Sequence, residues 1–160
     1  MRKWLEGIAL LVLGLHISIT LRALFGSDQL PERIPIQFDA TGHATGWGSA
    51  AMLLLLPAIT LIIYLLFTVV TRFPGAFDYP VKITAFNRQR MQGLALDMMA
   101  WLKVEIVTLL TWMQWVTIEV ARSPSRYIPS MMPAALVAVF ATFSVYIVMM
   151  FKAGREPHRL

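Results

Sequence analysis

The chain has no cysteine, and charged residues make up only 14% of its 160 residues. Without cysteine it has no disulfide framework, no thiolate metal site and no cysteine nucleophile. It also has no phosphate-binding glycine loop, nucleophile elbow or His-x-x-x-His pattern, so no motif points to an enzyme. Soluble domains are about one quarter charged, whereas this chain is 58% hydrophobic, which is typical of membrane proteins.

Four apolar runs are long enough to cross a bilayer, which takes about 20 helical residues. They are residues 4–25, 50–70, 94–120 and 131–151. Backbone groups inside hydrocarbon must be hydrogen-bonded within their own segment, so each run is expected to be a helix. The first run is too long for a cleaved signal peptide and is read as a retained anchor. We therefore predict an all-α membrane protein, a single domain (1–160) formed by a bundle of four transmembrane helices.

Lysine and arginine are distributed unequally between the two sides of these runs. One side has Arg2, Lys3, Arg72, Lys82, Arg88, Arg90, Lys152, Arg155 and Arg159. The other has Arg22, Arg33, Arg122 and Arg126. The positive-inside rule then places both termini in the cytoplasm and the first and third loops outside. Because the net charge of +5 follows this pattern, the lipid bilayer is the expected partner and nucleic acid is not.

The third run is expected to extend into the cytoplasm as part of a longer helix. Thr84 is a suitable N-cap, and no residue after it except Gly93 disfavours helix. A single helix over residues 85–121 would be about 55 Å long, which exceeds the thickness of the bilayer core.

The first loop, residues 26–49, is the most distinctive polar segment. Ile34, Ile36 and Phe38 alternate with polar residues and proline, which predicts an extended stretch with one apolar side resting on the helix ends. Trp47 is placed for the aromatic belt at the membrane surface. The residues of this loop that could bind a partner are Pro31, Ile34, Pro35, Ile36, Phe38, Gly42 and Trp47.

These residues also carry a resemblance. The pattern Leu30-Pro31-x-x-Ile34-Pro35-Ile36-x-Phe38-x-x-x-Gly42, followed by Trp47-Gly48-Ser49 and an apolar helix with Pro57, resembles a bacterial membrane domain of unknown function. That domain is found at the N-terminus of SdpI-type proteins, the immunity and signalling family of the sporulation-delay killing system. With a second, less specific stretch from Asp78 to Asn87, the resemblance covers about residues 4–120. It implies a multi-pass protein of the bacterial inner membrane that has no enzymatic activity and provides peptide-toxin resistance or signal reception.

The third run contains ionisable groups, which are costly at membrane depth and usually face protein or water. At 100° per residue they form a stripe, whose members are Asp97, Trp101, Glu105, Thr108, Trp112, Trp115 and Glu119. Lys103 and Gln114 lie on roughly the opposite side, so the stripe is expected to face other helices or a partner. One interpretation is a polar site of His16, Glu105 and Thr108 on a proton or cation path, with His16 as the partner of Glu105. The other interpretation is that each group forms a structural pair. No metal or other cofactor is expected, and the ten methionines are interpreted as packing residues.

A further pair is expected where hydrocarbon gives way to headgroups. Arg22 and Glu119 lie near the outward ends of helices that should run in parallel, so we expect their side chains to meet. The alternative is that Arg22 binds lipid phosphate and Glu119 faces water.

Three functions remain open at this point. The first is an immunity or signal-receiving protein whose outer loop meets a peptide or envelope partner. The second is an accessory subunit that stabilises a larger membrane complex through a protein partner in the membrane. The third is a small proton-linked carrier or membrane enzyme, which is supported only by Glu105 and its neighbours.

Overall fold

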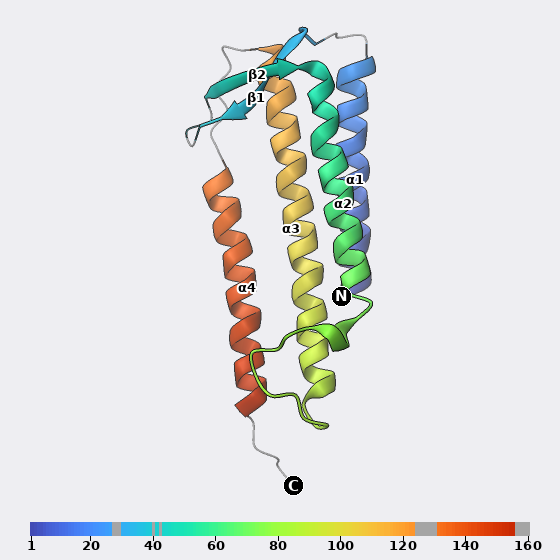
Figure 1. Cartoon of the computed structure of the whole chain (residues 1–160), viewed down its shortest axis with the longest axis vertical. Coiled ribbons are helices and arrows are strands. Elements are labelled where there is room, and N and C mark those ends of the chain that lie inside the picture. Colours follow the sequence, from blue (N-terminus) through green and yellow to red (C-terminus); the bar gives the residue numbers. More distant parts are fainter. Residues whose placement is uncertain (27–29, 40, 42, 124–130, 156–160) are drawn as a thin grey trace.

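The computed structural model describes residues 1–26, 30–39, 41, 43–123 and 131–155. The described residues form four long helices, which lie side by side along the molecule (Figure 1), and a short strand pair that lies across one end. In chain order the elements are α1 (Arg2–Phe25), β1 (Arg33–Phe38), β2 (Ala44–Ser49), η1 (Ala50–Leu54), α2 (Leu55–Val70), η2 (Pro74–Ala76), α3 (Arg88–Arg122) and α4 (Met132–Arg155).

Three helical stretches of the described residues are long and apolar enough to cross a membrane. They are α1, the stretch Ala50–Val70 formed by η1 and α2, and α4. Large apolar side chains on their outer faces are exposed, for example Leu11 at 71%, Ile62 at 64% and Val137 at 68%. A surface of this kind is unfavourable in water and suits lipid tails. The chain is therefore a membrane protein.

Helix α3 differs from the other three long helices, although all four were expected to cross the membrane. Charged and polar side chains such as Asp97, Lys103 and Gln114 interrupt its apolar runs, so its composition alone does not qualify it as a span. Three helices qualify by composition instead of four. Yet α3 packs against α1, α2 and α4, and Figure 1 shows it along the whole length of the bundle.

The start of α3 is organised by the threonine that the sequence indicated as an N-cap. The amide of Asn87 donates to Oγ1 of Thr84 at 3.3 Å, and the amide of Thr84 donates to Oδ1 of Asn87 at 2.8 Å. This reciprocal pair has the form of a capping box. Regular α-helix then begins at Arg88 instead of residue 85 and continues through Gly93 for 35 residues without a break.

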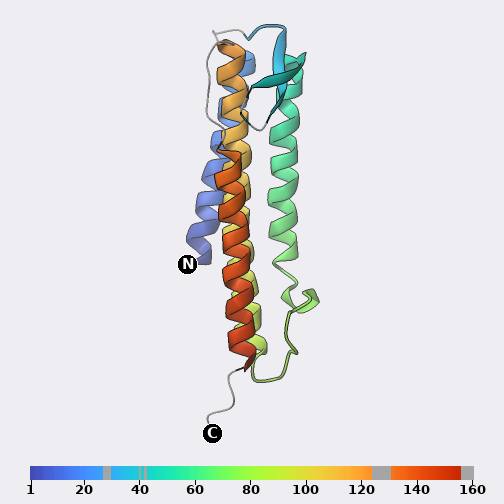
Figure 2. The same ribbon diagram turned by 90° about the vertical axis from the view of Figure 1, so that its left-hand side faces the viewer.

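The expectation of an all-α fold was wrong in one segment, because β1 and β2 pair as an antiparallel hairpin. Figures 1 and 2 show this hairpin lying across one end of the helices. Ile34 of β1 is fully buried and packs with Ala23 of α1, Leu53 of η1 and Ile118 of α3. The first loop is thus docked on the helix ends.

The side chains of β1 do not follow the expected alternation. Ile36 is 37% exposed and Phe38 is half-buried, whereas Pro35 is buried beside Ile34. The pairing with β2 shifts register between Pro35 and Gln37 and again between Gln37 and Phe38. Such irregularities bend a strand and change the direction of its side chains, so Ile34, Ile36 and Phe38 do not share one buried side.

The opposite end of the bundle is closed by the segment between α2 and α3. A cluster of Met91 and Ala95 on α3 with Met150 and Ala153 on α4 is covered by Phe77, Tyr79, Val81 and Ile83. The hydroxyl of Tyr79 donates to the Pro74 carbonyl at 2.7 Å, and burial raises the pKa of this hydroxyl above its ordinary value. This segment ties the start of α3 to the end of α4.

The orientation of the bundle stays a prediction that single cysteines test directly, since the chain has none of its own. Thr45 in the hairpin and Gly75 at the opposite end are both exposed. We expect an impermeant maleimide added to intact cells to label Thr45→Cys and not Gly75→Cys, and to label both after permeabilisation. The reverse pattern in intact cells would contradict the positive-inside assignment.

The docking of the hairpin is tested by two substitutions in the same strand. Ile34→Asp puts an unpaired carboxylate into a fully buried site and should cost about 3 kcal/mol or more. Ile36→Asp, at a partly exposed position, should cost about 1 kcal/mol or less. Thermal unfolding of the detergent-solubilised variants measures the difference, and equal losses for the two variants would show that the hairpin is not anchored through Ile34.

Candidate functional site

The polar side chains buried between the helices are the groups with the greatest chemical consequence. The most deeply buried are His16, Thr20, Thr60, Lys103, Thr111 and Gln114. Three of these lie on α3, on the side that faces α1 and α2. Because lipid offers no hydrogen bonds, the partners of these groups decide whether they stabilise the bundle or destabilise it.

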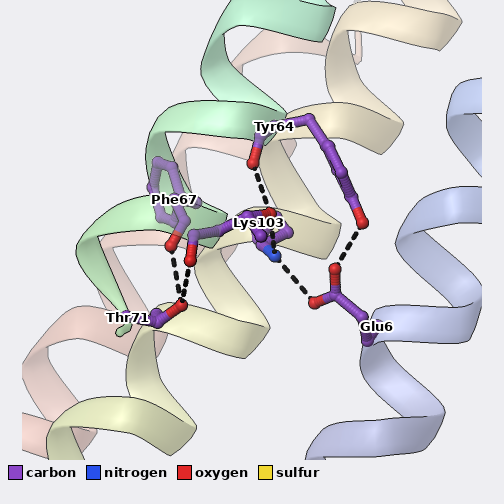
Figure 3. A network of polar contacts seen from close by, with 6 residues as sticks. Glu6, Tyr64, Phe67, Thr71 and Lys103 are labelled. Atoms are coloured by element: carbon purple, nitrogen blue, oxygen red, sulfur yellow. Dashed lines mark hydrogen bonds and ion pairs between the residues drawn. The ribbon is translucent and has the colours of Figure 1, made fainter. Parts of the chain in front are cut away.

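Lys103 lies where α1, α2 and α3 meet (Figure 3). Its ammonium donates to Oε2 of Glu6 at 2.7 Å and to Oγ1 of Thr68 at 2.9 Å. It also lies 4.7 Å from the centre of the Tyr64 ring, and the Tyr64 hydroxyl donates to the other carboxylate oxygen of Glu6. The Lys103 side chain is 3% exposed and that of Glu6 is 39% exposed. A buried ammonium is thus neutralised by a carboxylate that reaches the outer surface of the bundle.

The network around Lys103 supports a structural role. Thr68, which accepts from the ammonium, donates its own hydroxyl to the Tyr64 carbonyl at 2.8 Å. Both carboxylate oxygens of Glu6 have donors, and the Tyr64 ring adds a cation–π contact. A polar network with its members satisfied holds its helices in one register.

A second set of contacts lies nearer to the hairpin. The side-chain amide of Gln114 donates to Oγ1 of Thr20 at 2.8 Å and to the Leu53 carbonyl at 3.0 Å, which joins α3 to α1 and η1. Nδ1 of His16 lies 3.3 Å from Oγ1 of Thr111, and its buried Nε2 has no hydrogen-bond partner among the described residues. Across all the residues that the structure describes, no three metal-ligating side chains lie close enough together to bind a metal ion.

The expected site of His16, Glu105 and Thr108 is divided in the structure. His16 faces Thr111, whereas Glu105 points to the other side of α3 and accepts from Oγ1 of Thr142 on α4 at 2.5 Å. Thr108 lies with Glu105 beside α4. The suggested His16–Glu105 pair was therefore wrong, because the two residues lie on different faces of α3. The stripe itself faces α4 in part, while its members Trp101 and Trp115 are 38% and 40% exposed.

The expected contact between Arg22 and Glu119 is not among the ion pairs of the described residues, and this prediction was wrong. Glu119 lies 3.9 Å from Arg122, one turn further along α3. Arg122 lies on the same helix at i+3, so it reaches the carboxylate without any constraint on how helices pack. Among the described residues two ion pairs do join α1 to α3, Arg2 with Asp97 at 2.6 Å and Glu6 with Lys103 at 2.7 Å.

The expected partner-binding loop separates into an anchor and an outer face. Ile34 and Pro35 are buried, Phe38 is half-buried, and Pro31, Ile36 and Trp47 are exposed, with Trp47 at 45%. Gly42 lies outside the described residues. At the tip, Oδ1 of Asp39 accepts from the amides of Thr41 and His43, each at 2.9 Å. Asp39 thus orders the turn between the two strands.

Sequence reasoning missed the contacts of Lys103. Glu6 and Lys103 are 97 residues apart, and the helical projection showed only that Lys103 lies opposite the acidic stripe. The available signal was their opposite charge in two apolar runs that were expected to be parallel. Thr142 was missed because a single threonine in an apolar helix is an ordinary packing residue.

Comparison with known families adds one finding. A family described as "Domain of unknown function (DUF1648)" matches residues 15–61. The match begins within α1, includes the hairpin and η1, and ends within α2. No curated protein and no solved structure matches the chain. The part of the chain that is similar to this family is therefore the hairpin with the helix segments that hold it.

The structural role of the Lys103 network is tested by Glu6→Gln, Lys103→Met and the double variant. Each single change leaves one partner of a buried pair uncompensated, so each should lower the thermal stability in detergent. The double variant removes both charges, so its loss of stability should be smaller than the sum of the two single losses. The difference, which is the coupling energy of the pair, should be about 1–3 kcal/mol. Ser18→Ala, at an exposed position of α1, is the control. Losses that simply add would show that the pair does not couple α1 to α3.

Proposed function

We propose that the chain is a non-enzymatic protein of the bacterial inner membrane that binds a peptide or envelope partner through its β1–β2 hairpin. All four helices cross the bilayer in this proposal, and both termini lie in the cytoplasm. The hairpin then faces outward. The activity corresponds to that of SdpI-type immunity and signalling proteins, namely resistance to a peptide toxin or reception of a signal.

The packing of α3 supports four crossings. Its polar side chains Lys103, Thr111 and Gln114 have partners on neighbouring elements, so their burial in the bundle removes much of the cost of placing them at membrane depth. The remaining apolar side chains of α3 pack among the helices, as Val107 does with Ala9, Leu13 and Tyr64. In Figure 1 the start of α1 and the end of α4 both lie away from the hairpin, as expected for four crossings.

The single observation that carries the binding proposal is the division of the hairpin into an anchor and an outer face. Ile34 fixes the strand pair to α1, η1 and α3, so the hairpin has a defined position. Trp47 and Ile36, at 45% and 37% exposure, are then held outside the helix ends. A rigid scaffold that presents an aromatic and an aliphatic side chain is a suitable binding surface, because little entropy is lost when a partner docks.

The extent of the family match supports the same element. The match is confined to residues 15–61, which build the hairpin and hold it, and excludes α3 and α4. The motif Leu30-Pro31 to Phe38 and Trp47-Gly48-Ser49 lies inside it. A Cβ at Gly48 in this motif would lie 2.6 Å from Sδ of Met52 and 2.9 Å from Cδ1 of Ile36, so the ends of these two flexible side chains would have to move.

A second function, an accessory subunit of a larger membrane complex, is favoured by the outer face of α4. The buried residues of α4 are Met150 and Ala153, both near its C-terminal end. The remainder of the helix leaves a long apolar face for a neighbouring protein helix. Mild-detergent purification distinguishes the two functions: a stoichiometric larger partner supports the subunit, and a solitary chain supports the immunity protein.

The hairpin proposal predicts the effect of Trp47→Ala in a killing assay. Toxin-sensitive bacteria that produce the chain should survive purified sporulation-delay killing peptide, and Trp47→Ala should weaken this protection by about tenfold or more in toxin concentration, since aromatic anchors dominate interfaces. Phe73→Ala is the matched control, because Phe73 is 62% exposed but lies at the opposite end of the bundle.

Two further results complete this test. A photo-crosslinking residue at position 47 should capture the peptide, and one at position 73 should not. Absence of protection and of crosslinking, with the chain present in the membrane at normal levels, would contradict the toxin-binding function.

A further inference from the structure

A cavity of about 440 Å³ lies between α3 and α4, on the side of α3 away from α1 and α2. Its walls are mainly apolar, with Leu109 and Trp112 on α3 and the small residues Ala134 and Ala138 on α4. The alanines leave room that larger side chains would fill. A volume of this size falls in the range of about 300–1,000 Å³ in which proteins bind small organic molecules.

The polar groups in the wall of this cavity are Glu105 and Thr108. One oxygen of Glu105 accepts from Thr142 at 2.5 Å, and the other, Oε2, is buried and has no hydrogen-bond partner among the described residues. A carboxylate oxygen without a donor is costly in an apolar environment, and its cost is removed when a ligand supplies a positive charge. Among the described residues neither arginine nor lysine lines the cavity, and a cationic ligand would supply this charge.

We propose that the cavity between α3 and α4 is a binding site for a lipophilic organic cation, with Glu105 as its counter-ion. The apolar walls contact the hydrophobic body of the cation, and the indole of Trp112 provides an aromatic face that attracts positive charge. Thr108, whose side chain is exposed in the cavity, offers a hydroxyl that can accept from an ammonium proton.

The position of Glu105 favours a free cation over the amine of a lipid headgroup. Its partner Thr142 lies near the middle of α4, which extends from Met132 to Arg155. Headgroups lie at the ends of a spanning helix, about 15 Å from its centre when the hydrocarbon is about 30 Å thick. A cation whose apolar body dissolves in the bilayer can reach this depth. The site is independent of the hairpin function, because none of the described residues that line the cavity belongs to β1 or β2.

Binding of tetraphenylphosphonium to the purified full chain in detergent micelles tests the proposal, with protein-free micelles as background. We expect saturable binding by the wild type and a loss of about tenfold or more in affinity for Glu105→Gln, because one partner of a desolvated charge pair is removed. Glu105→Asp keeps the charge and should retain binding. Glu119→Gln, an acidic position of α3 outside the cavity, should bind like the wild type.

Two comparisons separate the charge from the cavity. Tetraphenylborate has nearly the same size and shape with the opposite charge, so in a separate titration it should show no saturable binding. Ala138→Phe fills the cavity without changing its charge and should abolish binding; variants are compared only if their helical circular dichroism and elution match the wild type.

Several results would overturn the proposal. They are the absence of saturable binding by the wild type, unchanged binding by either Glu105→Gln or Ala138→Phe, and equal binding of tetraphenylborate. Competition by phosphatidylethanolamine in nanodiscs that depends on Glu105 would identify a lipid amine as the occupant, which contradicts a free cation.

Discussion

The burial of polar side chains on α3 is the constraint on which the rest of the structure depends. A lysine ammonium in a low-dielectric environment is tolerated only with a carboxylate and further hydrogen bonds, and Lys103 has Glu6, Thr68 and the Tyr64 ring. These partners come from α1 and α2, so the position of one charge sets the relative heights of three helices. Apolar packing alone would allow helices to slide, because one apolar contact is nearly equivalent to the next.

The buried polar groups on the two sides of α3 differ in how completely they are hydrogen-bonded. Toward α1 and α2, Lys103 and Gln114 have several partners each, which supports a structural role for these contacts. Toward α4, the carboxylate of Glu105 has Thr142 for one oxygen and a cavity beside it for the other. A group that the fold leaves partly satisfied beside open space is the one able to respond to a ligand. This asymmetry separates the part of α3 that holds the bundle from the part available for binding.

The hairpin adds a rigid surface to a fold that is otherwise made of lipid-facing helices. Ile34 connects it to α1, η1 and α3 together, so its position depends on the packing that the polar contacts fix below it. The Gln114 side chain links the helix contacts to the hairpin directly. It donates to the carbonyl of Leu53, and the Leu53 side chain packs in the same cluster as Ile34. Changes in the helix contacts near Gln114 should therefore be transmitted to the hairpin.

The sequence by itself determined the helices and their order. Apolar runs of this length have one stable backbone form in lipid, and Thr84 carried enough local information to mark the turn before α3. These are local properties, since a helix closes its hydrogen bonds within a few residues. The extended backbone of Ile34 to Phe38 could likewise be predicted from the residues of that segment alone.

Only the tertiary structure decided which groups meet. The pairing of β1 with β2 could not be read from Ala44–Ser49, because its two glycines and small polar residues are typical of turns. Glu6 and Lys103 are distant in the chain, and His16 was assigned to Glu105 because depth could be estimated while the rotation of each helix could not. The charge of a side chain and its depth in the membrane can be predicted from the sequence. The rotation of each helix about its axis depends on the packing of all the side chains between the helices.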